Sequence, residues 1–541
     1  MACGRNQFRF AGGFKLIRSP LSTHEVEAKG KIIRAAGSVS LATLLSRILG
    51  FVRDMVIADL FGAKATADAF FIAFRIPNLF RRFTAEGALT AAFVPIFSNT
   101  LESRGKLQAF RLACNVLGIL ALVLAITISA GMIFTPQIVY AIAPGFIGDD
   151  KLFQLTSLLT MMMFPYLFFI SVTALFMAML NTLGKFFIPA LAPASFNIAV
   201  IICAFTMHDY FSQPTVALAV GVLVGGIAQL LVQLWPLFKL GFRYIPTFDL
   251  KDYATRRIGF LMAPAALGMA VAEINIFIDT LLASLLPEGS VSYLYYGNRV
   301  VQFPLGVFGI AVGIAALPSM SSIVARGKQA QLTDILSHSL RLIFFIAIPS
   351  TFGLILLADP ITNVLFERGQ FDAVARSGTA FAMVFYAIGL VAFSGVKIAA
   401  SAFYAMKDTK TPTKVASWCM LLNIVLNLLF MGPLKHGGLA LATSISSIVN
   451  LIMLLQIYRR EHKGVDGYKL VKSSLKMTAA SALMLVIVYS YITAFFSYEA
   501  STFARAGHLI IAVLVGAIVY ISTVYYIGSE EAKEIKKQFF K

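Results

Sequence analysis

Arginine and carboxylate side chains gather in one of the first apolar stretches of the sequence. Ser46, Gly50 and Arg53 are spaced i, i+4 and i+7, so they share one face of a helix. Arg47 and Asp54 lie seven residues apart on the adjacent stripe. A guanidinium keeps its proton and offers two parallel N–H donors to phosphate oxygens. This arc predicts a polar cavity suited to a diphosphate, whereas a cavity for cationic drugs would be lined by carboxylates and aromatic rings.

The next apolar stretch continues the pattern. Asp68 and Arg75 are seven residues apart, and Arg81 and Glu86 follow. An ionisable side chain inside a membrane span costs about 2.5–3.5 kcal/mol on insertion scales. We therefore expect these two stretches to face a polar cavity or one another rather than lipid on all sides.

The second half of the chain carries fewer such groups, among them Glu273, Asn275, Asp279, Arg299 and Lys397. Asn275 and Asp279 are spaced i and i+4, which places two oxygen-bearing side chains on one helix face. Oxygen ligands suit a hard cation, so this pair could form half of a cation site. The alternative is that Asp279 pairs with Arg299 or another basic group, and the spacing does not decide between the two.

The elements that position these groups are membrane-spanning helices. Of the 541 residues, 58% are hydrophobic and 13% are charged, and the mean hydropathy is +0.81. A soluble domain would carry roughly 25% charged residues. The apolar runs are about 20 residues long, the length at which a helix crosses ~30 Å of hydrocarbon, whereas a β-barrel would show short alternating segments. The composition predicts an all-α polytopic membrane protein.

We predict about fourteen transmembrane helices joined by short connections. Their expected ranges are 32–60, 66–97, 107–134, 153–180, 187–208, 215–238, 256–286, 291–317, 333–358, 375–405, 412–432, 437–458, 476–497 and 505–527.

Lysine and arginine predict the orientation, because these residues favour cytoplasmic loops. With the N-terminus inside, the internal cytoplasmic loops carry twenty of them. The outer loops carry six: Lys64, Lys151, Arg368, Arg376, Lys435 and Arg505. We therefore expect both termini to face the cytoplasm. The net charge of +19 fits anionic lipid headgroups, so membrane lipids, and no nucleic acid, are the expected partners.

An internal repeat divides the chain. At a shift of about 224 residues, 67–75 falls on 291–299, so that Arg75 aligns with Arg299; at 223, Pro189 aligns with Pro412. Six spans per unit make the repeats parallel, as in two-lobed transporters that bind substrate between the lobes. The expected parts are a cytoplasmic N-terminal extension at 1–30, an N-lobe at 31–240, a C-lobe at 241–460, two additional C-terminal helices at 461–530 and a cytoplasmic basic tail at 531–541.

Motifs for catalysis or metal binding are missing from the sequence. Its four cysteines are widely separated, and it has no HExxH, Walker loop, GxSxG or dinucleotide fingerprint. We therefore expect no enzyme, no metal site and no cofactor. Residues 1–30 have no apolar core and do not resemble a secretory signal peptide.

Several segments together resemble the MurJ (MviN) family of lipid II flippases, within the multidrug/oligosaccharidyl-lipid/polysaccharide exporter superfamily. The resemblance runs from about residue 31 to 530. The segments that carry it are LLSRILGFVRDMVIADLFGA, TADAFFIAFRIPNLFRRFTAEGALTAAFVPIFS, SVSYLYYGNRVVQFPLGVFGIAVGIAALPSMS, LFERGQF and FYAMKDTKTP. It implies fourteen helices in two lobes. Position by position, the family's substrate-binding residues fall on Ser46, Arg47, Arg53, Asp68, Arg81, Glu86, Ser292 and Arg299.

The resemblance also implies a function: alternating-access export of lipid II, the undecaprenyl-diphosphate-linked disaccharide peptide, across the bacterial inner membrane for cell-wall synthesis. Some relatives bind Na⁺ through a carboxylate at the place of Asp279 and oxygen ligands on a later helix, but 375–405 contains no matching acid. Alternatives are a flippase for another lipid-linked oligosaccharide such as O-antigen, a cation-coupled drug antiporter, and a membrane scaffold. The arginines argue against the antiporter, and the cost of buried charge against the scaffold.

The charge bias makes the topology testable. In a cysteine-free background, single cysteines at Asp149 and Arg368 should react with an impermeant thiol reagent added to whole cells, because these loops are predicted to face the periplasm. A cysteine at Lys251 should be protected. Labelling at Lys251 together with protection at the other two would reverse the orientation.

Overall fold

The chain folds into α-helices joined by short connections. The computed structural model describes residues 23–81, 89–306, 310–327, 329–462, 464 and 467–539, and these contain no β-strand. Glu86 and most of the predicted extension at 1–30 lie outside the described residues. The α-helices are α1 (Thr23–Phe61), α2 (Ala65–Arg81), α3 (Leu89–Ile133), α4 (Thr135–Ile142), α5 (Asp150–Met163), α6 (Tyr166–Thr182), α7 (Phe187–Met207), α8 (Val216–Lys239), α9 (Tyr253–Ser284), α10 (Ser290–Pro304), α11 (Ile310–Ala325), α12 (Gln329–Leu356), α13 (Ala358–Phe366), α14 (Ala373–Ile388), α15 (Leu390–Ala405), α16 (Lys410–His462), α17 (Gly467–Phe495), α18 (Thr502–Tyr526) and α19 (Glu530–Phe539).

Two of these helices contain a break where the sequence predicts a loop. In α3 the backbone is non-helical at Gly105, between the predicted spans 66–97 and 107–134. In α16 it is non-helical at Lys435, between 412–432 and 437–458. The predicted span 375–405 is a bent pair, α14 and α15, at 42° to each other.

Eight helical segments among the described residues are long and apolar enough to cross a membrane, or up to nine if the bent pair is one span. The all-α polytopic class is therefore confirmed. The count of fourteen spans and the two-lobe repeat stay predictions.

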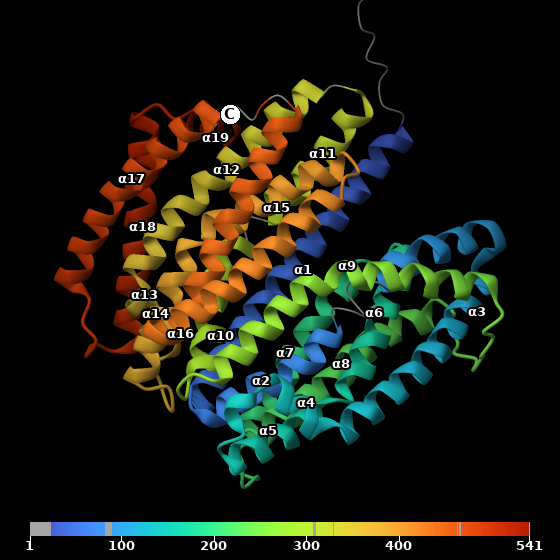
Figure 1. Cartoon of the computed structure of the whole chain (residues 1–541). Coiled ribbons are helices and arrows are strands. Elements are labelled where there is room, and N and C mark those ends of the chain that lie inside the picture. The colour runs from blue at the N-terminus through green and yellow to red at the C-terminus, as the bar shows by residue number, and fades with distance from the viewer. Residues whose placement is uncertain are drawn as a thin grey trace, which may run out of the picture.

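The helices form two bundles (Figure 1). Helices α2 to α8 gather in one and α10 to α18 in the other, while α1 and α9 run along the boundary between them. Helix α1 packs on α7 and also touches α13, and α9 packs on both α3 and α16. The two boundary helices thus contact both bundles, so groups on them can face a space between the bundles.

Helices α17 and α18 pack on each other, and α17 also packs on α12. Their other faces expose large apolar side chains such as Leu483, Val486, Leu514 and Ile518. In water such a surface would be costly, whereas lipid tails solvate it. We therefore infer that these faces contact lipid.

The terminal helix α19 is held by ion pairs to α12. Nη1 of Arg341 lies 2.7 Å from Oε2 of Glu530 and 3.3 Å from Oε1 of the buried Glu531. Nε2 of His338 lies 3.6 Å from Oε1 of Glu534. The hydrogen bond from Arg341 lowers the pKa of Glu530. This contribution to docking is present above the ordinary pKa of a glutamate and is lost as the pH falls through the lowered value.

Candidate functional site

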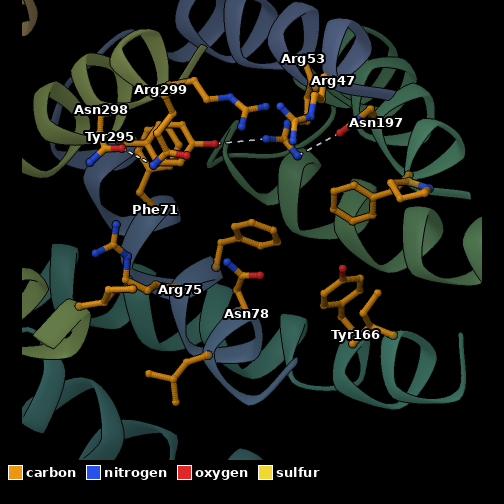
Figure 2. Close-up of a pocket in the computed structure, with 18 of the residues that line it drawn as sticks. Arg47, Arg53, Phe71, Arg75, Asn78, Tyr166, Asn197, Tyr295, Asn298 and Arg299 are labelled. Atoms are coloured by element: carbon orange, nitrogen blue, oxygen red, sulfur yellow. Dashed lines mark hydrogen bonds between the residues drawn. The ribbon is translucent and has the colours of Figure 1, made fainter. Parts of the chain in front are cut away.

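A cavity of about 640 Å³ lies between the two bundles, within the usual size range of ligand sites, roughly 300–1,000 Å³. Figure 2 shows Arg47, Arg53 and Arg299 on one side of it, and Asn78 and Tyr166 across the open space. Helices α1, α2, α6, α7, α8, α9 and α10 supply most of its wall. Two further residues, Tyr386 and Thr443, come from α14 and α16.

Asp54 holds two of the arginines. Its side chain is fully buried. Oδ1 of Asp54 accepts from Nη2 of Arg53 at 2.6 Å and from the hydroxyl of Tyr295 at 3.1 Å. Oδ2 lies 2.7 Å from Nε of Arg299. Arg53 and Asp54 belong to α1 and Arg299 to α10, so one carboxylate joins the boundary helix α1 to the bundle that contains α10.

Further hydrogen bonds fix the position of Arg53. Its Nη1 donates to Oδ1 of Asn197 on α7 at 3.1 Å, and its Nη2 donates to the Tyr295 hydroxyl at 3.2 Å (Figure 2). Nδ2 of Asn197 in turn donates to the backbone carbonyl of Ser46 at 3.1 Å. The guanidinium is thus oriented by an amide, a phenol and a carboxylate together.

Arg47 differs from these two arginines. It lines the cavity, and its Nη1 lies close to the backbone of Gly306 beyond α10. Its guanidinium has no hydrogen bond or ion pair with the residues that the structure describes. Arg47 therefore remains available to an anion.

Asp68 and Ser292 contact each other but do not line the cavity. Oδ1 of Asp68 accepts from N and Oγ of Ser292 at 2.8 and 2.5 Å, and Oδ2 accepts from N of Gly289 at 2.7 Å. The carboxylate thus caps the N-terminus of α10 and ties it to α2. Of the other predicted site residues, Arg81 ends α2 and its side chain lies outside the described part, as does Glu86.

Two more contacts join the bundles at the loops predicted to face the periplasm. N of Gln370 donates to the carbonyl of Asp59 at the end of α1, at 2.8 Å. N of Gly145 donates to Oγ of Ser284 at the end of α9, at 3.3 Å. With the Asp68–Ser292 contact, they hold the two bundles together at this end.

Asn275 and Asp279 come together as the sequence predicts, with three more polar groups around them. Oδ2 of Asp279 accepts from Nδ2 of Asn275 at 3.2 Å, and Oδ1 accepts from Nδ2 of Asn427 at 2.7 Å. With its amide turned, Asn423 brings Nδ2 to 3.1 Å from Asp279 Oδ1. Thr443 lies next to Asn423.

Arg299 pairs with Asp54 rather than with Asp279, and the basic residue near Asp279 is Arg75 on α2. Nη1 of Arg75 also donates to Oγ1 of Thr280 at 2.5 Å. The two sequence alternatives for Asp279, a cation site and an ion pair with a basic group, both stay predictions. Among the described residues no group of three or more His, Cys, Asp or Glu could hold a metal ion. A cation at Asp279 would have to use amide and hydroxyl oxygens.

Sequence reasoning missed three kinds of partner. Asp54 was recognised as polar but not as the bridge between the bundles, because its second partner lies 245 positions away at Arg299. Asn197 is a single amide in an apolar span, which is a usable signal. The oxygen groups near Asp279 come from α16 at Asn423 and Asn427, not from 375–405 where they were sought.

Comparison with known proteins identifies the family of this chain. The family model for "Lipid II flippase MurJ" matches residues 57–514. The chain belongs to the MurJ family. A "Probable lipid II flippase MurJ" of Vibrio cholerae is 37% identical over 467 residues, covering 85% of this chain and 88% of that protein. A "Lipid II flippase MurJ" of Burkholderia cenocepacia is 37% identical over 427 residues, covering 78% and 83%.

Solved structures agree with this assignment. A MurJ described as "inward closed conformation" superposes with a TM-score of 0.76 at 27% identity, covering 93% of this chain and 99% of that one. An inward-facing multidrug resistance MATE family transporter superposes with a TM-score of 0.66 at 15% identity, covering 80% and 99%. The second likeness concerns the fold alone. This MurJ-family chain is thus a multi-pass protein of the bacterial inner membrane.

The packing of Arg299 against α1 generates a prediction. A Cβ added at Gly50 would lie 2.8 Å from Nη2 of Arg299 and 3.3 Å from Nδ2 of Asn197. Gly50→Ala should therefore displace the guanidinium from Asp54 and reduce function about tenfold or more, the loss of a hydrogen bond to a charged group. Complementation of a depleted strain measures it. Gly37→Ala on the same helix has no atom within 4 Å of its added Cβ and should be silent; equal activity of both variants would contradict the assignment.

Proposed function

We propose that this chain is a flippase that moves lipid II from the cytoplasmic to the periplasmic leaflet by alternating access, for cell-wall synthesis. The observation that carries the proposal is an arginine cluster in a cavity between two bundles, in a chain of the MurJ family. The bundles contact each other at the loops predicted to face the periplasm. A substrate carried on an isoprenoid diphosphate presents an anion to such a cavity, and its apolar chain stays in lipid.

The charges of the cavity support an anionic cargo. The described lining residues include Arg47, Arg53, Arg75 and Arg299 against Glu273 and Asp279. Asp54 occupies one edge of Arg53 and of Arg299, which orients both guanidinium groups. Their remaining N–H groups and the whole of Arg47 could therefore bind the diphosphate, with Asp54 as the preorganising group.

We propose two lobes related by a parallel repeat, 31–240 and 241–460, followed by two additional helices. Contacts between repeat-equivalent residues support it, since a two-fold axis brings equivalent positions together. At a shift of 224, Asp68 aligns with Ser292, to which it is hydrogen bonded. Phe71 aligns with Tyr295, and their rings stack at 4.1 Å.

The contacts at the loop ends repeat the relation. Gly145 aligns with Gly369 at the same shift. A Cβ at Gly145 would strike the carbonyl of Ser284, and one at Gly369 would strike the carbonyl of Asp59. Each proposed lobe thus inserts a glycine loop against the boundary helix of the other. We propose that these paired contacts close the periplasmic side, with both termini in the cytoplasm and residues 1–30 and 531–541 on that side.

A monovalent cation such as Na⁺ is a secondary proposal for Asp279. Asn275, Asn423, Asn427 and Thr443 lie around the carboxylate, and each carries a side-chain oxygen, the ligand type that suits a hard cation. Oδ1 of Asn427 is buried without a hydrogen-bond partner among the described residues, so this oxygen is available as a ligand for a cation. Rotation of the amides would turn these oxygens toward a cation.

The central test substitutes the arginines. Arg47→Ala, Arg53→Ala and Arg299→Ala should each abolish rescue of a strain depleted of this protein while membrane levels stay normal. The lysine variants should be impaired partly, because they keep the charge but lose bidentate geometry. Arg111→Ala, an exposed arginine outside the cavity, is the control. Lipid II in the outer leaflet is the readout; full rescue by all three alanine variants would refute the cavity assignment. Flipping of another lipid-linked oligosaccharide instead would select that alternative.

The charge of the cargo predicts the driving force. Moving a negative diphosphate from an inside-negative cytoplasm outward is favoured by about 2.3 kcal/mol per charge per 100 mV. Collapsing the membrane potential should therefore stop flipping, whereas collapsing the proton gradient alone should not.

Asp279→Asn should slow turnover without abolishing it if the cation acts in the return step. Complete loss in Asp279→Asn would instead make ion coupling obligatory, and continued flipping in depolarised cells would exclude the potential as the driving force.

A further inference from the structure

The N-lobe wall of the cavity contains buried polar side chains that the arginine cluster does not use. Helix α8 is apolar from Val216 to Leu234 apart from Gln229 and Gln233, which lie one turn apart on the same face. Thr173 lies on the neighbouring α6. All three line the cavity and are nine-tenths or more buried, with 5%, 1% and 5% of Gln229, Gln233 and Thr173 exposed.

These three groups lack the partners that such residues normally have. Glutamine and threonine inside membrane bundles usually hydrogen bond across helices. Here Oε1 of Gln229, Oε1 of Gln233 and Oγ1 of Thr173 have no partner among the residues that the structure describes. An unsatisfied buried polar atom costs about 1–3 kcal/mol. Three at one cavity wall indicate a ligand that pairs with them when it is bound.

Local packing brings the three groups together. A Cβ on Gly226 of α8 would lie 2.8 Å from Cδ2 of Tyr166 on α6, so the absence of a side chain lets the two helices approach closely. In the predicted topology both helices run from the outer to the inner face. Two turns beyond this contact on each helix lie Thr173 and Gln233, at the same level. Gln229 lies between that level and Gly226.

The wall also presents backbone acceptors. Pro189 and Pro193 of α7 both line the cavity. Pro193 has no N–H to donate to the carbonyl of Pro189, so a helical acceptor is released there. The wall therefore combines two carboxamides and a hydroxyl, all without charge, with a backbone carbonyl that lacks its usual i+4 donor.

We propose that Thr173, Gln229 and Gln233 form a neutral subsite that binds the uncharged hydroxyl- and amide-bearing head of the cargo, a sugar or peptide group, while the arginines bind the diphosphate. Figure 2 shows Tyr166, on the same helix as Thr173, across the open space from Arg47 and Arg53. Carboxamides offer a donor and an acceptor each, which matches N-acetyl and peptide groups. Amide rotation lets either end of each glutamine face the ligand. The inference rests on the proposed lipid-linked cargo.

The test separates the head from the diphosphate. Binding of lipid II and of undecaprenyl diphosphate, which lacks the head, is measured on the purified full-length chain. The variants are Thr173→Val, Gln229→Leu and Gln233→Leu, with Arg299→Ala for comparison. Each subsite variant should weaken lipid II by about two- to tenfold, the loss of one neutral hydrogen bond, and leave undecaprenyl diphosphate unchanged. Arg299→Ala should weaken both ligands.

Matched controls exist elsewhere in the chain. Thr160 and Thr215 are also buried with hydroxyls that lack a partner among the described residues, but they do not line the cavity. Thr160→Val and Thr215→Val should leave both affinities unchanged. All the valine and leucine variants should unfold at the same temperature as the parent chain or higher, because each replaces an unpaired polar group with an apolar one of similar shape.

Each outcome of these binding and unfolding measurements supports or overturns a proposal. Subsite variants that bind both ligands as the parent chain does, or that lose both equally, overturn the neutral subsite and leave the flippase proposal standing. Lower unfolding temperatures for the subsite variants alone also overturn it, because the groups would then serve the fold. A parent chain that binds neither ligand refutes the flippase proposal itself, and the subsite with it.

Discussion

Asp54 is a carboxylate with no exposure to solvent, and an unpaired charge in that position would be untenable in a membrane protein. It is balanced by Arg53 from its own helix and by Arg299 from the other bundle. The cost of burying one charge therefore ties the boundary helix α1 to the bundle that contains α10. Breaking either ion pair would leave the carboxylate partly uncompensated, which is more damaging than losing a surface ion pair. Asn197 and Tyr295 complete the arrangement, so the guanidinium groups are held before any substrate arrives.

The same logic divides the cavity by chemistry. Arg47, Arg53 and Arg299 lie on the α1 and α10 side, where Asp54 balances two of them. Uncharged amides and a hydroxyl lie on the α6 and α8 side. A cargo with an anionic linkage and a neutral polar head would satisfy both sides. Asp279 belongs to neither side, because its amide surroundings and Arg75 give it a network of its own.

The sequence was informative where the energetic cost of an arrangement depends on residues that are close together in the chain. The apolar runs indicate helices because no aqueous fold tolerates them, and Ser46, Arg47 and Arg53 line the cavity because a polar arc on one helix needs a polar space. Contacts between distant segments were less accessible. The residues near Asp54 in the sequence do not indicate that Arg299 is its partner. Nor does the sequence around Asp68 indicate that its side chain caps α10 rather than facing the cavity. The unpaired state of Gln229 and Gln233 depends on their neighbours, although their isolation in an apolar helix was visible.

The glycine loops at Gly145 and Gly369 meet carbonyl groups of the opposite boundary helix. Both glycine loops meet main-chain carbonyl groups, so these contacts depend largely on shape and on main-chain dipoles, and the Asp68 carboxylate that caps α10 is buried. Exposed ion pairs weaken as salt rises, whereas buried contacts are screened little. A seal made in this way would hold at similar strength in dilute and in saline surroundings. A bacterium whose periplasm follows the composition of the external medium could then keep this barrier intact without adjusting the protein.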